Sequence, residues 1–350
     1  MRTLALLATS NARLLIFFVL ATSILSLACF SSDKDDSQST TSSVDLDFYA
    51  TIPRTTDPNI IKVGSCPVDI AFDGRYIWVV NKIQTGSPIR RIDPDTNEYL
   101  ELPGSGKFNT ALLILDGKLW TTSALEDKIY QIEPANGDVL AEYQVGKFPY
   151  QLASNGKYLW ISNLMDHSVT KLDVNARRVV ATIAVGQTPH GLLFVDGLVW
   201  VRNTGDGTLI ALDPETDKII KEVAVPAGSG LLYEYDGYVW APNYHHDTLG
   251  KVDPVKGELV GTYPVGDKPW KATSDGTHLW VSNSGDNTLM EIDPTTGAVM
   301  RTIDSKGPEP LALIYVKEHL WLVNSGDSAL YSLDVDAHSN VAKIDIKAFH

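Results

Sequence analysis

The sequence predicts an all-β protein: a seven-bladed β-propeller of four-stranded antiparallel blades, preceded by a signal segment and a flexible linker. Three observations predict this fold. Tryptophans recur every 40–42 residues, and turn signals divide each interval into four short runs. No segment between residues 47 and 346 keeps a helical apolar period for three turns. One four-stranded sheet cannot bury its faces alone, so neighbouring copies must stack.

Seven of the eight tryptophans mark the repeat. They are Trp78, Trp120, Trp160, Trp200, Trp240, Trp280 and Trp321, with intervals of 42, 40, 40, 40, 40 and 41 residues. The copies span about 61–101, 102–143, 144–183, 184–223, 224–263, 264–303 and 304–346, within a propeller domain predicted at 47–350. We expect each repeat tryptophan on the second strand of its blade, where burial of the ring between blades contributes roughly 2–4 kcal/mol.

The fourth copy illustrates how the strands are assigned. An Asp-Gly pair at 196–197 is a strong hairpin signal, and Asp213-Pro214 opens a second turn. The four predicted strands are 190–195, 198–202, 208–212 and 219–223. An asparagine after the second strand suits an Asx-type turn, which an aspartate three residues later completes. Because these polar residues recur in nearly every copy, we assign them to the scaffold.

Two segments compete to complete the last blade. Residues 46–52 and 341–346 both resemble the fourth strand of a copy. The last copy is complete in its own phase, so we expect the C-terminal segment to close the ring, with 46–52 outside it. The alternative is a clasp in which the N-terminal strand completes the last blade.

Residues 1–28 form a predicted lipoprotein-type signal peptide. An apolar run of about fifteen residues follows Arg13, too short for a comfortable membrane span. The run ends in LSLAC, which resembles a bacterial lipobox and predicts lipidation of Cys29, although Ser26 stands where leucine is preferred. We therefore expect an exported, membrane-anchored lipoprotein facing the periplasm or the cell exterior. An uncleaved anchor or an ordinary signal peptide would also export the chain.

Residues 29–46 are rich in serine, threonine and aspartate, and they form a predicted flexible linker to the lipid anchor. We expect this anchor to be the only membrane contact. The chain has two cysteines, so a lipidated Cys29 leaves Cys66 without an intramolecular partner and the fold without a disulfide. The formal net charge of −14 argues against nucleic acid as a partner, because phosphate binding needs basic surface. We expect a monomer.

The repeat pattern PxxxAxDGxxLWVxNxxDxTLxxIDPxTGxVxxTI, over residues 61–346, resembles the YVTN-type propeller repeat family. This resemblance implies a seven-bladed propeller of bacterial or archaeal exported proteins. The copies are also similar to those of the virginiamycin B lyase family, which implies opening of a cyclic depsipeptide with metal, histidine and glutamate. That family carries LWFTE where this chain reads LWVSN, VWVRN and VWAPN. The family's glutamate is missing from every copy, which argues against lyase chemistry.

Candidate site residues are those that deviate from the repeat in the loops expected around the central channel. The residue after the repeat proline is Val68, Asn109, Tyr150, His190, Gly230, Trp270 or Leu311, copy two lacking the proline. The predicted ligand-binding residues are Tyr150, His190, Arg202, Tyr244, His245, His246, Trp270, Lys271 and Glu309. Aromatic, cationic and imidazole groups suit a small anionic or aromatic molecule or a peptide. A glycan or a partner protein is also possible.

Each candidate has a plainer interpretation. His190 can be a packed neutral side chain, and Arg202 can pair with Asp206 in its own loop. Trp270 is expected on an exposed lip, where an aromatic ring favours binding. We expect no cofactor; the alternative is a divalent metal held by His190 and His245 or His246, with Asp247 or Glu309.

No Ser-His-Asp spacing, phosphate loop or zinc motif is present. The sequence therefore favours a binding module, with catalytic residues unassigned. The alternatives are a metal-assisted lyase or hydrolase and a structural protein of the cell envelope.

Overall fold

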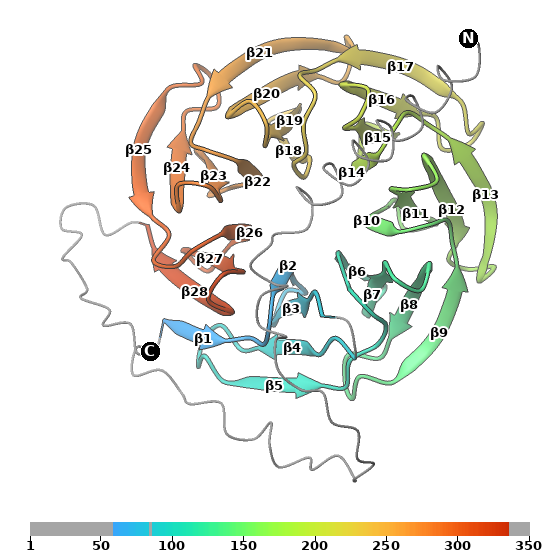
Figure 1. Cartoon of the computed structure of the whole chain (residues 1–350), viewed down its shortest axis with the longest axis horizontal. Helices are drawn as coiled ribbons and strands as arrows, with labels where there is room; N and C mark the ends of the chain where they lie inside the picture. Colours follow the sequence, from blue (N-terminus) through green and yellow to red (C-terminus); the bar gives the residue numbers. More distant parts are fainter. Residues whose placement is uncertain (1–58, 84–85, 336–350) are drawn as a thin grey trace, which may run out of the picture. The chain divides into compact units, whose positions relative to one another are not determined.

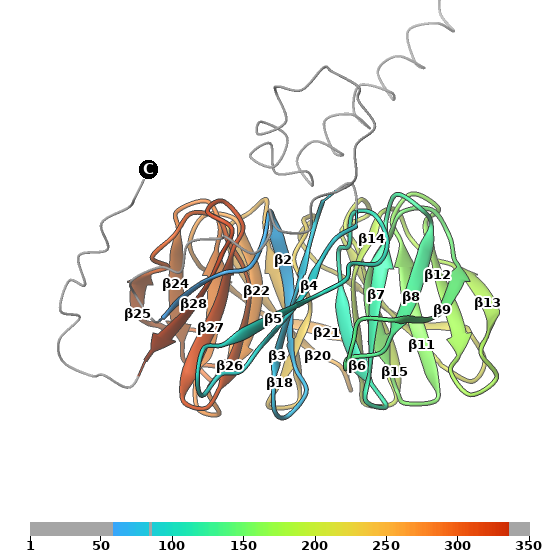
Figure 2. The same cartoon turned by 90° about the horizontal axis from the view of Figure 1, so that it is seen from below.

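The computed structural model describes residues 59–83 and 86–335 of the 350-residue chain. Every regular element in these ranges is a β-strand. The strands form seven four-stranded antiparallel sheets arranged as blades around a common axis (Figure 1). Seen from the side, the blades stand next to one another as a squat ring (Figure 2). The predicted seven-bladed propeller is confirmed. Within the described ranges there is no helix that could cross a membrane.

The first four blades each use four consecutive strands. Blade 1 contains β2 (Pro67–Phe72), β3 (Ile77–Asn81), β4 (Ile89–Ile92) and β5 (Tyr99–Leu102). Blade 2 contains β6 (Leu112–Leu115), β7 (Lys118–Ser123), β8 (Lys128–Ile132) and β9 (Val139–Gln144). Blade 3 contains β10 (Pro149–Ser154), β11 (Tyr158–Asn163), β12 (Ser168–Asp173) and β13 (Arg178–Ala184). Blade 4 contains β14 (Pro189–Val195), β15 (Leu198–Asn203), β16 (Thr208–Leu212) and β17 (Ile219–Ala224).

Blades 5 and 6 follow the same plan, and blade 7 departs from it. Blade 5 contains β18 (Tyr233–Tyr235), β19 (Tyr238–Asn243), β20 (Thr248–Asp253) and β21 (Glu258–Pro264). Blade 6 contains β22 (Pro269–Ser274), β23 (Leu279–Asn283), β24 (Thr288–Ile292) and β25 (Val299–Asp304). Blade 7 contains β26 (Pro310–Val316), β27 (His319–Asn324), β28 (Ala329–Asp334) and β1 (Ile60–Lys62). In blades 1 to 6 the first strand lies nearest the axis and the fourth lies at the rim (Figure 1).

The repeat tryptophans are buried between blades, as predicted. Each lies on the second strand of its blade and is at most 2% exposed. Trp200 of blade 4, for example, packs with Leu232 and Val239 of blade 5. The ring is complete, because Trp321 of blade 7 shares a core with Ile70 of blade 1. The side chain that repeats therefore supplies the packing that holds each blade to the next.

The recurring aspartates fasten loops to each other and do not complete the asparagine turn. Asp166 Oδ2 accepts a hydrogen bond from the Lys147 N–H at 2.7 Å, and Asp206 Oδ2 accepts one from the Gln187 N–H at 2.6 Å. Both bonds join the loop after the second strand to the loop that enters the same blade. The expectation that these aspartates complete the turn of the preceding asparagine is thus wrong. Their carboxylate oxygens instead accept hydrogen bonds from backbone N–H groups nineteen residues away.

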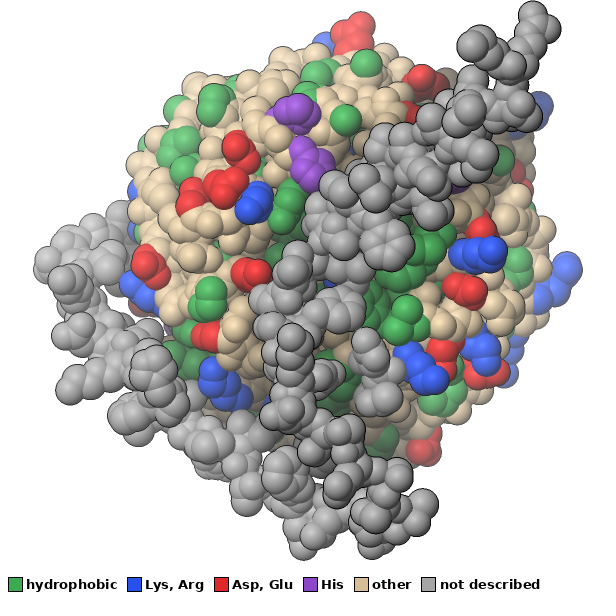
Figure 3. Space-filling view, in the orientation of Figure 1, with side chains coloured by type: hydrophobic (Ala, Val, Ile, Leu, Met, Phe, Trp, Pro, Cys, Tyr) green, Lys and Arg blue, Asp and Glu red, His purple; other side chains and the backbone are tan. Residues whose placement is uncertain are grey.

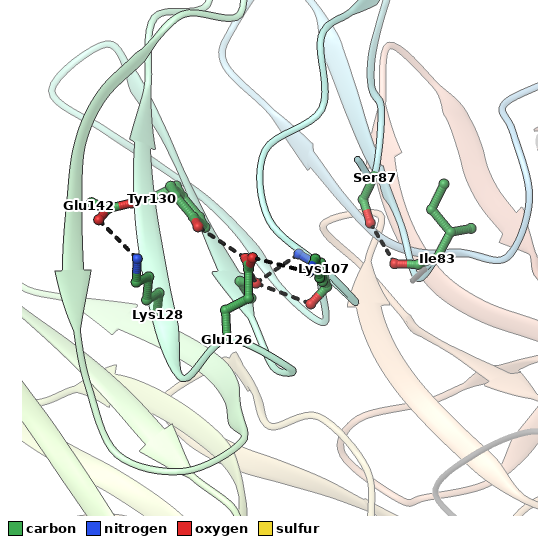
Figure 4. Close-up of polar contacts among 8 residues, drawn as sticks. Ile83, Ser87, Lys107, Glu126, Lys128, Tyr130 and Glu142 are labelled. Atoms are coloured by element: carbon green, nitrogen blue, oxygen red, sulfur yellow. Dashed lines mark hydrogen bonds and ion pairs between the residues drawn. The ribbon is translucent and has the colours of Figure 1, made fainter. Parts of the chain in front are cut away.

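Blade 2 replaces this polar pair with Ser123 and Glu126. The Glu126 carboxylate lies between Lys107 and Tyr130, whose hydroxyl donates to Oε2 at 3.0 Å (Figure 4). Burial opposes its ionisation, but hydrogen bonds from Ser123 and Tyr130 together with nearby lysines lower the pKa of Glu126. Burial and Glu126 raise the pKa of Tyr130 to about 12. This off-pattern acidic group serves the scaffold.

The N-terminal strand β1 closes the ring, which corrects the expected closure. Ile60 pairs with Tyr331 and Lys62 with Ala329, so β1 forms the outer edge of blade 7. The Val63 N–H also donates to the Ser328 carbonyl at 3.1 Å. Pairing the first described strand with the last one closes the ring through backbone hydrogen bonds. The segments 46–52 and 341–346 lie outside the described residues.

Cys66 precedes β2 in the entry loop, where it has a positive φ of 52°. The other cysteine of the chain, Cys29, lies outside the described residues, so the expectation of a fold without a disulfide stays a prediction. Cys29, the predicted signal peptide and the linker lie outside the described residues, so lipidation and export stay predictions.

Candidate functional site

The site is built at the start of the inner strands, directly after the position of the repeat proline. Strand pairing aligns the blades, because Leu113 lies opposite Trp120 as Ala153 lies opposite Trp160. The residues at this position are Val68, Thr110, Tyr150, His190, Gly230, Trp270 and Leu311. In blade 2 it is Thr110 and not the expected Asn109, which takes the proline position. The interval from Trp78 to Trp120 is 42 residues rather than 40, so alignment by sequence alone placed this position one residue too early.

Five of the predicted residues form one group, which we name the axial aromatic cluster: Tyr150, His190, Tyr244, His245 and Trp270. The ring centroids of Tyr150 and His190 are 4.1 Å apart, and those of His190 and Trp270 are 5.4 Å apart. Tyr244 lies 5.8 Å from Trp270 and 5.3 Å from His245. Blades 3, 4, 5 and 6 thus contribute to one set of touching rings. These five off-pattern side chains therefore lie together, and their binding of a ligand stays a prediction.

The cluster runs from the interior to solvent. His190 is 0% exposed, Tyr150 5% and Trp270 9%, whereas Tyr244 is half-buried and His245 is exposed. The expected exposed lip at Trp270 is therefore wrong. Its indole packs edge-on against both His190 and Tyr244, which removes it from solvent.

Blade 5 carries a glycine at the cluster position. Blade 5 lies between blades 4 and 6, and the glycine is Gly230. Gly230 has a φ of +149°, and an added Cβ would overlap the Pro242 carbonyl oxygen. The neighbouring Leu231 N–H donates to the Trp270 carbonyl at 2.8 Å. Glycine therefore meets both a conformational and a spatial requirement here.

His190 is a buried, neutral imidazole with unused hydrogen-bonding capacity. Neither Nδ1 nor Nε2 makes a hydrogen bond of good geometry. Burial, followed by the charges of Arg202 and Lys82, lowers the pKa of His190 to about 3, although a hydrogen-bonding contact with the Gly230 backbone acts in the opposite direction. At neutral pH the imidazole has one donor and one acceptor nitrogen. Buried polar atoms without a partner also occur on the repeat tryptophans, such as Trp160 Nε1 and Trp200 Nε1, so what distinguishes His190 is its occurrence in one blade only.

Arg202 places a positive charge beside the cluster. Its side chain is 1% exposed. Nη1 donates to the Pro242 carbonyl at 2.5 Å and Nη2 to the Pro226 carbonyl at 3.4 Å, while Nε has no partner. Burial lowers the pKa of Arg202 to about 10, so it stays charged at neutral pH. The alternative pairing with Asp206 does not form, because Asp206 accepts from the Gln187 N–H.

Lys271 is used within the protein. Its Nζ lies 3.1 Å from Asp69 Oδ1, so the ion pair joins blade 6 to blade 1. Asp69 Oδ2 also accepts the Leu112 N–H of blade 2 at 3.0 Å. Asp69 is 3% exposed, and its carboxylate contacts residues of blades 2 and 6 from its own position in blade 1. Lys271 therefore lies where the sequence predicted but already has an anionic partner.

Glu309, His246 and Asp247 do not join the aromatic rings. The Glu309 N–H donates to Asn287 Oδ1 at 2.9 Å, and its buried Oε2 has no partner. His246 is exposed. Asp247 Oδ1 accepts the Lys268 N–H at 3.0 Å, which joins blade 5 to the entry loop of blade 6.

The alternative metal set is not assembled. Among the described residues, the one group of three whose ligand atoms lie within 4.8 Å of each other is Asp275, His278 and Glu291. It sits at the Asp-Gly turn of blade 6, away from the cluster. His278 Nδ1 lies 3.0 Å from Glu291 Oε1, Glu291 also pairs with Arg301, and Asp275 Oδ2 accepts the Trp280 Nε1–H at 2.8 Å. These atoms serve blade packing.

Lys82 is the residue that sequence reasoning missed. It follows β3 in blade 1 and is half-buried, with its Nζ 4.6 Å from the centroid of Phe108. Burial lowers the pKa of Lys82 to about 8, and the charge of Glu309 acts against this change. The signal was present, since a lysine follows the turn asparagine in this copy alone. An ammonium of lowered pKa and a carboxylate therefore border the cluster.

The end-on surface places apolar groups near the axis. In Figure 3 hydrophobic side chains gather toward the middle of the visible face, and charged ones lie mostly farther out. Histidine side chains are exposed on the same face.

Comparison with solved structures supports the fold. Virginiamycin B lyase from Staphylococcus aureus aligns with a TM-score of 0.68 at 17% identity, covering 79% of this chain and 98% of the lyase. A catalytically inactive histidine-to-alanine variant of that lyase with quinupristin aligns with a TM-score of 0.66, also at 17% identity, covering 80% and 97%. Hydrazine synthase from Kuenenia stuttgartiensis aligns at 0.66 and 13% identity, covering 82% and 98%.

At these identities the likeness extends to the fold alone. No family model matches the chain, and no curated protein sequence matches it significantly. The resemblance to the YVTN-type repeat therefore stays a prediction. The chain is similar in structure to virginiamycin B lyase-like seven-bladed propellers.

Proposed function

We propose that this chain is an exported, lipid-anchored binding module that takes a small ligand at the axial aromatic cluster. The observation that carries the proposal is His190, which is fully buried between Tyr150 and Trp270 with no hydrogen bond of good geometry at either ring nitrogen. The unpaired indole nitrogens of Trp160 and Trp200 recur with the repeat, whereas this imidazole occurs in one blade only. A ligand that supplies a donor or an acceptor would satisfy the imidazole, and the rings would hold its apolar body.

The asymmetry of the ring supports the same proposal. The repeat position after the proline holds small or aliphatic residues in several blades but large rings in blades 3, 4 and 6. Tyr244 extends the cluster from Trp270 toward solvent. A purely structural propeller of the cell envelope has no need for this local departure from its own repeat.

Replacement of Tyr244 tests the binding proposal. We expect wild-type protein to bind members of a panel of aromatic amides, dipeptides and monosaccharides in ligand-observed NMR. Tyr244→Ala should weaken the hits about ten-fold, because a half-buried ring contributes about 1.5 kcal/mol of contact. Tyr99→Ala is the matched control, since Tyr99 is 37% exposed on the rim strand β5. The proposal would be contradicted if no compound of the panel bound, or if the compounds bound wild-type protein and Tyr244→Ala with equal affinity.

A second candidate is a metal-assisted lyase, which the fold likeness to a quinupristin-bound lyase favours. This candidate is the weaker one, because the described residues do not bring the expected metal ligands together at the cluster. We expect quinupristin incubated with the protein and Mg²⁺ to remain cyclic. Mass spectrometry detects the ring-opened product, and product formation that His190→Ala abolishes would establish the lyase instead.

A further inference from the structure

Two arginines are fully buried in the described part of the chain, and their partners differ. Arg90, 2% exposed, pairs with the Glu101 carboxylate through both Nε and Nη2. Arg202, 1% exposed, contacts only the neutral carbonyls of Pro242 and Pro226. Buried charges in proteins are normally paired, because an isolated one loses its hydration without an ionic partner. Arg202 therefore carries an uncompensated charge.

No carboxylate among the described residues forms an ion pair with Arg202, and Glu309 acts on Lys82 and Tyr244 at the border of the cluster. Lys271 already occupies Asp69. His190 is neutral and has no negative form at physiological pH. The Nε–H of Arg202 remains without an acceptor, so one strong donor is still available. A charge-assisted hydrogen bond to an anion is stronger than one to a neutral carbonyl.

We propose that the ligand of the axial cluster is a small organic carboxylate with a planar aromatic body, whose carboxylate is bound by Arg202. This inference rests on the proposed binding function and names its ligand class. One carboxylate balances one guanidinium charge, whereas a phosphate dianion would leave negative charge in excess in a buried place. The neutral His190 donates a second hydrogen bond, and Tyr150 and Trp270 pack against the body.

The electrostatic neighbourhood agrees with this placement. Arg202 lowers the pKa of both His190 and His245, after the larger effect of burial. The guanidinium charge is therefore felt at the buried and at the exposed end of the cluster. Arg202 thus adds a positive contribution at both ends, while Glu309 and Asp267 act on Tyr244 and Asp69 acts on Tyr150.

The experiment uses indole-3-acetate as the charged probe and indole-3-acetamide as its neutral match, with phenyl phosphate as a third probe. Calorimetric titration of the full mature protein should show the acetate bound about ten-fold or more tightly than the amide. Arg202→Met should reduce that ratio to about two-fold or less, and Arg202→Lys should retain part of it. Arg90→Met is the matched control, which loses an arginine of equal burial but should keep the ratio.

Each outcome decides the inference. Equal affinity for acetate and amide, or an unchanged ratio in Arg202→Met, overturns the carboxylate while leaving an aromatic binding module standing. Binding of phenyl phosphate alone assigns the anion site to phosphate and overturns the commitment to a carboxylate. Failure of all three probes at about 10 mM, the limit of useful affinity, overturns the inference. If the neutral panel of the Tyr244 experiment also fails, the proposed function falls with it.

Discussion

Deletion of residues 59–63 should cost the protein most of its stability. This segment contains β1, whose Ile60 and Ile61 are 9% and 5% exposed against blade 7. Burial of two isoleucines and the lost strand pairing together amount to about 5 kcal/mol, which is comparable to the total stability of many domains. We expect a large drop in the urea midpoint, followed by circular dichroism, and a tendency to aggregate because β28 becomes an open edge.

Truncation after Val335 is the control for this result. It removes residues 336–350, including the segment that the sequence predicted as the closing strand, and should shift the midpoint by less than about 1 kcal/mol of unfolding free energy. If the C-terminal truncation proved as damaging as the β1 deletion, closure by β1 alone would be wrong.

Replacement of Gly230 by alanine should be the most damaging single substitution at the site. The φ of +149° is costly for alanine, and its Cβ would overlap the Pro242 carbonyl. Together these effects should lower the free energy of unfolding by about 3 kcal/mol or more. Because backbone displacement would separate His190 from Trp270, probe binding should be lost as well. Thermal unfolding and the calorimetric titration measure the two effects.

Gly237→Ala separates the two causes. Gly237 has a φ of +73° but nothing within 4 Å of an added Cβ. It lies in the Asp-Gly turn of blade 5, so its replacement should cost only about 1 kcal/mol and leave binding intact. If Gly230→Ala were as stable as Gly237→Ala, the backbone at Pro242 would be shown to move aside at little cost.

The architecture was predictable because the repeat constrains it many times over. The blade is specified by the seven tryptophans on second strands and by the Asp-Gly turn of the fourth copy. Because the copies share one pattern, strands assigned in one copy could be assigned in the others. The closure was not predictable in this way, since β1 occurs once and is three residues long. Pattern alone cannot distinguish Ile60–Lys62 from other short apolar runs near the N-terminus.

The grouping of the candidate residues was easier to predict than their contacts. Departure from the repeat selected Tyr150, His190 and Trp270, which lie together because side chains at one repeat position converge on one axis. It did not indicate that Trp270 is buried or that Arg202 contacts proline carbonyls. Those contacts depend on the packing between blades, which a pattern within one copy does not encode, and a role in binding stays a prediction.

Closure by β1 has a consequence for the order of folding. The strand that seals the ring is synthesised before any blade, yet its partner β28 is the last described strand. Contacts within a blade are local and can form early, whereas the β1–β28 pairing must wait for almost the entire chain. Until then both edges are exposed. The ring can therefore close only after nearly all of the described strands have been made, and its earliest described strand makes the last contact.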